Sequence, residues 1–157
     1  MAEAMPPDLL ARLAAGETVP ADDVELSAGG FDATAIGLTW DRFAADRVEA
    51  HVDCGPPHHQ PYGLVHGGVW CSIVETVASI AGALRVASRG QLTVGVSNTT
   101  DFLRSHREGR VDAVATPLHV GRLQQLWQVE ITRASDGKLV AHGQVRLQNI
   151  DATQIGG

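Results

Sequence analysis

The clearest pattern in the first half of the chain is an alternation of apolar and polar residues over residues 48–54. The apolar positions are Val48, Ala50, Val52 and Cys54. Side chains two residues apart on a strand face the same side, so this spacing predicts a half-buried β-strand. Residues 35–41 predict a second strand before it.

The first 30 residues predict less regular structure. Residues 7–15 have the composition of a short helix, with Pro7 near its start and Gly16 placed to end it. Residues 16–34 are rich in Gly, Asp and Pro, and we expect a loop there. Phe31 is a large apolar residue within this loop, and we expect it to cover the edge of the core.

A long loop and a buried helix follow. Residues 55–67 contain three prolines, whereas residues 69–84 contain none. The second stretch has apolar residues on nearly every side and a single charge, Glu75. A helix that is apolar all round is a buried one, and this one is short and interrupted by polar residues. We therefore expect a core helix and no membrane span.

Four more strands are predicted in the second half of the chain. They cover residues 92–103, 110–120, 124–133 and 138–149. Asp136-Gly137 is a strong hairpin signal between the last two, and Glu108-Gly109 marks the turn between the first two. Consecutive strands joined by short turns favour antiparallel pairing. The prediction is an α+β fold in which a curved antiparallel sheet wraps around one long central helix.

The length of 157 residues predicts one domain with a sizeable core. Residues 1–30 would form an N-terminal extension made of the short helix and the loop. Residues 31–150 would form the folded domain, and residues 151–157 a frayed tail.

Charge and cysteine content limit the possible binding partners and the cellular compartment. Lys and Arg number 12 and Asp and Glu 18, so the net charge is −6, which does not support binding to nucleic acid or to an anionic membrane. Cys54 and Cys71 form no CxxC pair and have no metal-finger spacing, so we expect two free thiols. The N-terminus lacks the basic and apolar regions of a signal peptide. These features predict a cytoplasmic protein.

Glu75 is the residue of the buried helix that most needs an explanation, because an unpaired buried carboxylate is costly. It could form a salt bridge or hydrogen bonds in the core, or it could be a general base or nucleophile facing a pocket. Ser72, Ser79 and Gly82 share its helix face by their spacing. This face of small residues fits either a lined cleft or a close packing contact.

The sequence His66-Gly67-Gly68 stands where the loop turns into the same helix. A helix N-terminus presents unpaired N–H groups, and glycine lets a ligand oxygen approach them, so this point could hold a polarised carbonyl. The alternative is a tight loop-to-helix turn. Gly67 and Glu75 lie eight residues apart, about 12 Å along a helix axis at ~1.5 Å per residue. If both act on one carbonyl, they come from two subunits, which predicts a dimer with two symmetric sites at the interface.

Two other chemistries find little support in the sequence. His58, His59 and His66 lie in the proline-rich loop without regular ligand spacing, so we expect no metal site. Ser72 and Ser79 lie in no G-x-S-x-G motif, so we expect no serine nucleophile.

A nine-residue string that precedes the helix, followed by Glu75 and Ser79, resembles the hotdog-fold thioesterases of the PaaI type. The string is Gln60-Pro61-Tyr62-Gly63-Leu64-Val65-His66-Gly67-Gly68. It looks like the branch that includes 4-hydroxybenzoyl-CoA thioesterases and 1,4-dihydroxy-2-naphthoyl-CoA thioesterases. The resemblance extends over about residues 35–149. It also includes Gly95-Val96-Ser97 and the turn Leu118-His119-Val120-Gly121-Arg122.

The resemblance implies a catalytic role for five residues. The Gly67 backbone N–H would donate to the thioester carbonyl, and His66 and Gln60 would orient that region and the substrate. Glu75 of the neighbouring subunit would attack the thioester or activate water, and Ser79 would hold Glu75 or place the water. The function so implied is hydrolysis of an acyl-CoA or aroyl-CoA to the free acid and CoA.

The resemblance also implies where CoA binds and how the chains assemble. Arg104 and Arg122 are the candidates for the CoA phosphates, since an anion on an acidic protein needs local arginines. The full set of implied substrate and CoA contacts is Arg104, Arg122, Gly68, Ser72 and His119. The assembly would be a homodimer or a tetramer made of two dimers. No cofactor is expected beyond the CoA of the substrate.

Two alternatives on the same fold stay open. One is a non-catalytic acyl-CoA-binding protein, although such a protein has no use for a buried acid that faces a thioester. The other is a hydratase or dehydratase, which usually pairs an Asp with a His in the loop before the helix. Asp53 and His58 are present here but not in that arrangement.

Overall fold

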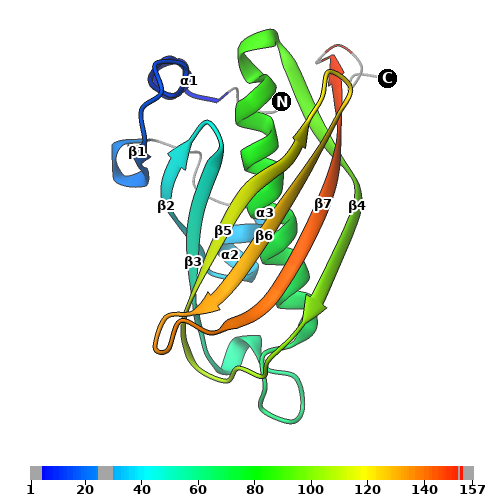
Figure 1. Cartoon of the computed structure of the whole chain (residues 1–157). Coiled ribbons are helices and arrows are strands. Elements are labelled where there is room, and N and C mark those ends of the chain that lie inside the picture. Colours follow the sequence, from blue (N-terminus) through cyan, green and yellow to red (C-terminus); the bar gives the residue numbers. More distant parts are fainter. Residues whose placement is uncertain (1–4, 25–29, 152, 154–157) are drawn as a thin grey trace.

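A seven-stranded antiparallel sheet wraps around one long helix in the computed structural model, which describes residues 5–24, 30–151 and 153 (Figure 1). The strands are β1 (Val19–Pro20), β2 (Leu38–Ala44), β3 (Arg47–Cys54), β4 (Gln91–Phe102), β5 (Gly109–Val120), β6 (Gln124–Arg133) and β7 (Leu139–Asp151). The helices are α1 (Pro7–Ala14), α2 (Phe31–Ala35) and the central α3 (Gly67–Val86), with 3-10 turns η1 (Ala21–Asp23), η2 (Pro56–His58) and η3 (Ala87–Arg89). The predicted curved antiparallel sheet around a central helix is confirmed.

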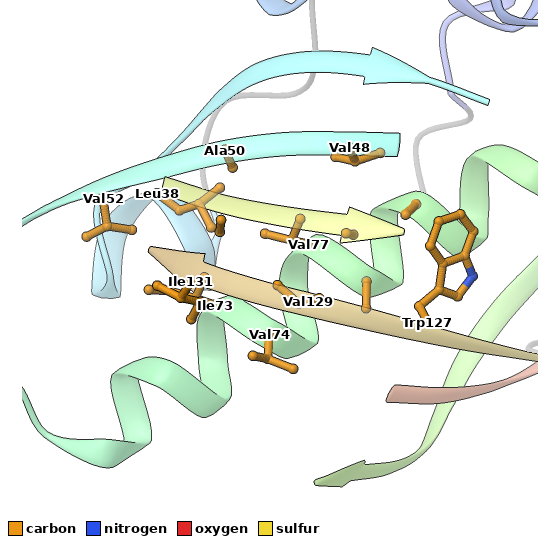
Figure 2. Close-up of a cluster of buried hydrophobic side chains, with 14 of the residues drawn as sticks. Leu38, Val48, Ala50, Val52, Ile73, Val74, Val77, Trp127, Val129 and Ile131 are labelled. Atoms are coloured by element: carbon orange, nitrogen blue, oxygen red, sulfur yellow. The ribbon is translucent and has the colours of Figure 1, made fainter. Parts of the chain in front are cut away.

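The core lies between α3 and the concave face of the sheet. Figure 2 shows side chains of β3, β6 and α3 pointing into this space. The alternate β3 residues Val48, Ala50 and Val52 are at most 1% exposed, as the alternating pattern predicts. Each fully buried Val, Ile or Leu side chain contributes about 1.5–3 kcal/mol relative to an exposed one, so this layer holds the sheet on the helix.

The order of strands in the sheet is β1-β2-β3-β5-β6-β7-β4. The hairpins β5–β6 and β6–β7 follow the predicted turns, and Gly137 has the positive φ of 67° that such a turn favours. β4 and β5, however, are not neighbours. Residues 103–108 carry the chain from β4, which pairs with β7 and with no other described strand, to β5, which lies between β3 and β6. β4 is therefore an edge strand (Figure 1).

The N-terminal segment contributes to the same core. α1 forms where the sequence predicts a helix, and its residues Leu9 and Leu13 are buried with Val19 of β1. The boundary at residue 30 stays a prediction. Within the region expected to be a loop, β1 instead pairs with β2, and η1 and α2 form short helical turns. Residues 1–4 and 25–29 lie outside the described residues.

The expectation that Phe31 covers the core is wrong, since its side chain is 63% exposed. Ile36, directly after α2, is 4% exposed and belongs to the core cluster in its place. At the other end of the chain, Asp151 is the last residue of β7. The rest of the predicted frayed tail lies outside the described residues except residue 153.

α3 continues through η3 as one apolar helical stretch, Gly67–Arg89. By length and composition alone it could cross a membrane, so the expectation that it is too short for this is wrong. Half of its most apolar window is buried inside the protein, against the sheet. The position of α3 as the centre of the core accounts for its composition.

Candidate active site

The N-terminus of α3 is arranged by the side chain of His66. His66 is the N-cap residue, and its Nδ1 accepts a hydrogen bond from the backbone N–H of Gly68 at 2.9 Å. The next N–H, of Val69, donates to the His66 carbonyl at 2.9 Å. The Gly67 N–H has no partner among the described residues. One free donor therefore remains at the positive end of the helix dipole.

A cleft of about 280 Å³ opens beside this donor. Its lining includes Gly67, Gln60 and Arg104, so the structure brings three of the predicted site residues together. The other lining residues are Leu64, Val65, Trp70, Phe102, Leu103, Ser105 and His106. A Cβ at position 67 would lie 2.5 Å from the ring of Phe102, so any larger residue here would have to displace this exposed ring. Gln60 is oriented by its Oε1, which accepts from Tyr62 N at 2.8 Å.

Glu75 lies two turns further along α3, half-buried, on the side that faces β4. Its Oε2 accepts a hydrogen bond from Asn98 Nδ2 at 2.9 Å, and its Oε1 accepts one from Ser79 Oγ at 3.4 Å. None of the ion pairs among the described residues includes Glu75. A salt bridge therefore does not explain this acid. It does not line the Gly67 cleft of its own chain.

The four small and polar residues predicted on one helix face have different roles. Ser79 contacts Glu75, whereas Ser72 Oγ donates to the carbonyl of Gly68 at 2.8 Å. Gly82 is buried, and a Cβ there would collide with the Leu147 side chain of β7. The face is thus half-buried beside Glu75 and Ser79 and becomes a close packing contact at Gly82.

The two predicted CoA contacts, Arg104 and Arg122, lie at opposite ends of the sheet. Arg104 Nη1 donates to the carbonyl of Leu139, where β7 begins, at 2.7 Å. Arg122 follows β5, and its carbonyl accepts from Asn149, near the end of β7, at 3.1 Å. Leu139 and Asn149 are ten residues apart, about 33 Å at ~3.3 Å per residue. Arg122 and His119 line a separate hollow of about 430 Å³.

Comparison with known proteins assigns the family. A model described as the thioesterase superfamily matches residues 62–140, about half of the chain and nearly all of the site. The chain belongs to this superfamily.

Three relatives show how far the similarity extends. Rv1847 of Mycobacterium tuberculosis, which carries the name "Putative esterase", is 46% identical over 119 residues, 74% of this chain and 84% of that protein. The structure of the thioesterase HI1161 from Haemophilus influenzae has a TM-score of 0.71 at 34% identity and covers 76% of this chain and 82% of that one. The proofreading thioesterase EntH of Cronobacter sakazakii is 36% identical over 96 residues, 61% of this chain and 69% of that protein. The predicted hotdog-fold thioesterase family is confirmed, and the protein is a thioester hydrolase.

Two residues of β4 lie beside Glu75. Sequence reasoning missed Asn98 and named Gly95 only as part of the family resemblance, without a role. Asn98 contacts Glu75, and Gly95 lies so close to Glu75 that a Cβ there would be 2.6 Å from Oε1. Both lie in β4, where apolar and polar residues do not alternate, so the sequence did not indicate which side chains face the helix. A run of polar residues from Ser97 to Asp101 in a strand was the signal that one face of this strand meets a polar site.

The histidines of the loop before α3 hold the loop. Gly55 N–H donates to His58 Nδ1 at 3.1 Å, so the proton of the neutral ring is on Nε2, which faces the Ile36 carbonyl at 3.1 Å. His59 contacts the carbonyl of Arg107 at 2.7 Å. In the part of the chain that the structure describes, no three His, Cys, Asp or Glu side chains cluster closely enough to hold a metal ion.

The two cysteines are free, as predicted, and differ in their surroundings. Cys54 belongs to the core, and burial, with a smaller effect from the charge of Asp53, raises the pKa of its thiol to about 12. Cys71 is half-buried on α3, one turn before Glu75. Only Cys71 is placed near the site.

Proposed function

We propose that the enzyme hydrolyses an acyl-CoA or aroyl-CoA thioester in the cytoplasm, with Glu75 as the catalytic carboxylate. The proposal rests on two polar groups, the Gly67 N–H and the Glu75 carboxylate, for which the packing of the core gives no structural role. Among the described residues the Gly67 N–H, beside a cleft, has no partner, and Glu75 is half-buried and held by two hydrogen bonds without an ion pair. The resemblance to the PaaI-type branch supports CoA as the thiol.

The two groups would act on one thioester from two copies of the chain. They are about 12 Å apart along α3, too far for one carbonyl group to meet both. β4 supports the association, because among the described residues it is a 12-residue edge strand with one unpaired side and exposed apolar side chains, such as Val96 and Phe102. A two-fold axis would place Glu75 of each copy near the Gly67 cleft of the other. The smallest active unit is then a homodimer, and a tetramer made of two dimers would carry four sites.

The chemistry requires one water and no electron transfer, so we propose no cofactor or metal. The Gly67 N–H polarises the thioester carbonyl, while His66 and Gln60 shape that end of the cleft. Glu75 either attacks the carbonyl carbon, forming an anhydride that water then hydrolyses, or removes a proton from the attacking water. In both routes the C–S bond breaks, the thiolate of CoA takes up a proton, and the acid is released.

The positions of the arginines constrain how CoA could lie. Leu139 and Asn149, which Arg104 and Arg122 contact, are about 33 Å apart at ~3.3 Å per strand residue, so one phosphate group cannot meet both arginines within a single copy. Arg104 lines the Gly67 cleft and so serves the substrate of its own cleft. Arg122 and His119 would contact that CoA only from another copy.

A thiol-release assay tests the proposal. Wild type and Glu75→Gln are compared on a panel of aroyl-, short-chain and long-chain acyl-CoAs. Wild type should turn over at least one class, and the variant should lose roughly 100- to 10,000-fold in kcat. If CoA esters bind to wild type without thiol release, the protein is an acyl-CoA binder and the proposal is wrong.

Mixing two inactive variants tests the two-copy site. Glu75→Gln and Gln60→Ala are each purified and then allowed to exchange subunits. In a mixed dimer, one site combines the intact Glu75 of one copy with the intact cleft of the other, so activity should return. Each variant alone, taken through the same procedure, is the control. Mixed dimers without regained activity would show that each site belongs to one chain.

A further inference from the structure

We propose that Asn98 is a positioning residue that fixes Glu75 for reaction through its Oε1 atom. The inference rests on the proposed role of Glu75 and adds a residue from a different part of the fold. Asn98 Nδ2 donates to Glu75 Oε2 at 2.9 Å and to the backbone carbonyl of Cys71 at 3.1 Å. One side chain of β4 thus ties the carboxylate to the helix that carries it.

The orientation of the Asn98 amide follows from its partners. A backbone carbonyl can only accept hydrogen bonds, so the atom that faces Cys71 O must be the NH2 group. The same group faces Glu75 Oε2, and both of its hydrogens are then used. The carbonyl oxygen of Asn98 accepts from Thr100 Oγ at 2.7 Å. Asn98 therefore has no free donor for the substrate, and it acts through Glu75.

A β-bulge brings these residues to the helix side of β4. Gly95 pairs with the buried Leu147 and Asn98 with the buried Val145, so both face α3. Three residues apart in a regular strand, they would face opposite sides. The register shifts between Gly95 and Ser97, so Val96 is an extra residue on this strand. Bulges of this kind re-aim side chains beside active sites.

Gly95 and Asn98 leave the two carboxylate oxygens of Glu75 in different states. Oε2 is fixed by the amide of Asn98, whereas Oε1 has, within the described part of the chain, only the longer contact with Ser79 at 3.4 Å. Oε1 also lies where a side chain at position 95 would be, so the glycine provides its space. Oε1 is thus the oxygen that remains available to attack the thioester or to take a proton from water.

The test compares Asn98→Leu with Thr99→Val in the thiol-release assay. Leucine keeps the approximate shape of asparagine and removes both donors. We expect kcat to fall about 10- to 100-fold, the range that a misplaced catalytic group produces, with KM unchanged. Thr99 pairs with the exposed Gln144 and faces the outer side of the same strand, so Thr99→Val should keep the wild-type kcat. An unchanged kcat in a folded Asn98→Leu would overturn the proposal.

A double-variant cycle separates positioning from a general structural role. In a Glu75→Ala background, Asn98→Leu should cause no further loss of the residual rate, because its effect passes through the missing carboxylate. An equal loss in both backgrounds would overturn the proposal while leaving the role of Glu75 intact. A wild-type kcat in Glu75→Ala would overturn both. If Asn98→Leu does not fold, Thr100→Val takes its place, because it removes the hydrogen bond that Thr100 donates to the Asn98 carbonyl oxygen. We then expect kcat to fall several-fold, and an unchanged kcat would contradict the proposal.

Discussion

Two polar regions of this protein differ in how completely their hydrogen bonds are satisfied. Gln125 and Asn149, on β6 and β7, are buried and fully paired. Gln125 donates to the carbonyl of Gly82 and to Asn149, and accepts from the indole N–H of Trp127. Asn149 donates to the carbonyls of Gly121 and Arg122. Around Gly67 and Glu75, in contrast, the groups are exposed or half-buried and only partly paired.

This difference in hydrogen bonding separates polar residues that stabilise the fold from those proposed to act on the substrate. The buried amides of Gln125 and Asn149 together connect α3, two strands and a turn. All their donors and acceptors are used, so neither can bind a ligand. A helix N–H without a protein partner and a carboxylate with one weakly held oxygen contribute little to the fold, and they are the groups that the proposed function uses. The predictions below remove groups from each region in turn.

Of the four changes below, removal of the Gly67 N–H should have the largest effect on kcat. Gly67→Pro deletes this donor at the first helical position, where proline is well tolerated, and His66 already has the extended ψ of 137° that suits a residue before proline. Because a Cβ would meet Phe102, the variant is made with Phe102→Ala. We expect kcat to fall about 100- to 1,000-fold against Gly67→Ala in the same background. Equal kcat values for the proline and alanine variants would contradict the role of this N–H.

Removal of a buried amide should instead lower stability. Gln125→Leu leaves the carbonyl of Gly82, the Trp127 N–H and the Asn149 carbonyl oxygen without their partner. The expected loss in the free energy of unfolding is about 1–3 kcal/mol for each group left unpaired. Urea unfolding at a fixed protein concentration measures this loss, and the kcat of the folded variant should stay near wild type. A stable variant with a large loss in kcat would reverse the comparison.

Removal of Arg104 should mainly affect substrate binding. Arg104→Ala should raise KM for CoA thioesters roughly tenfold, the scale of one charge-assisted hydrogen bond, and barely change KM for a truncated thioester without the nucleotide. Arg133→Ala is a control with the same change in charge, since Arg133 pairs with Asp136 at 3.0 Å in the β6–β7 turn. Equal effects on both substrates would remove Arg104 from the CoA site.

The two cysteines should differ in their rate of alkylation and have the smallest effect on activity. Burial raises the pKa of Cys54 to about 12, so below that pH its thiol stays protonated, and only thiolates react readily. Cys71 on the half-open face of α3 should therefore be alkylated first by iodoacetamide at about pH 8. Mass spectrometry of time points distinguishes the two peptides. Faster labelling of Cys54 would mean that the core opens locally.

Much of the fold could be predicted because its signals are local. The alternation over residues 48–54 predicted β3, and the apolar stretch 69–84 predicted α3, which spans Gly67–Val86. Glu75 stood out as the single charge in that stretch, and the glycines after His66 marked the helix start. The family's spacing then connected these residues with Gln60 and Ser79.

What the local signals missed depends on contacts between distant segments. The sequence places β4 directly before β5, yet β4 pairs with β7, because strand order is decided by which hydrophobic faces meet around α3. Asn98 faces Glu75 only because the bulge at Val96 changes the side of β4 on which it lies. Phe31 is a large apolar residue of the kind found in cores, but Ile36 is buried in the core in its place.

The sequence by itself determined the central helix, the long strands, the lone acid and the glycines at the helix start, because side-chain periodicity and glycine placement are properties of short segments. Only the tertiary structure decided that Glu75 is held by Asn98 of a distant strand, that Gly82 packs while Ser79 stays beside the acid, and that the two arginines lie at opposite ends of the sheet. These features arise from strand pairing and register, and they exist only once residues far apart in the chain share one core.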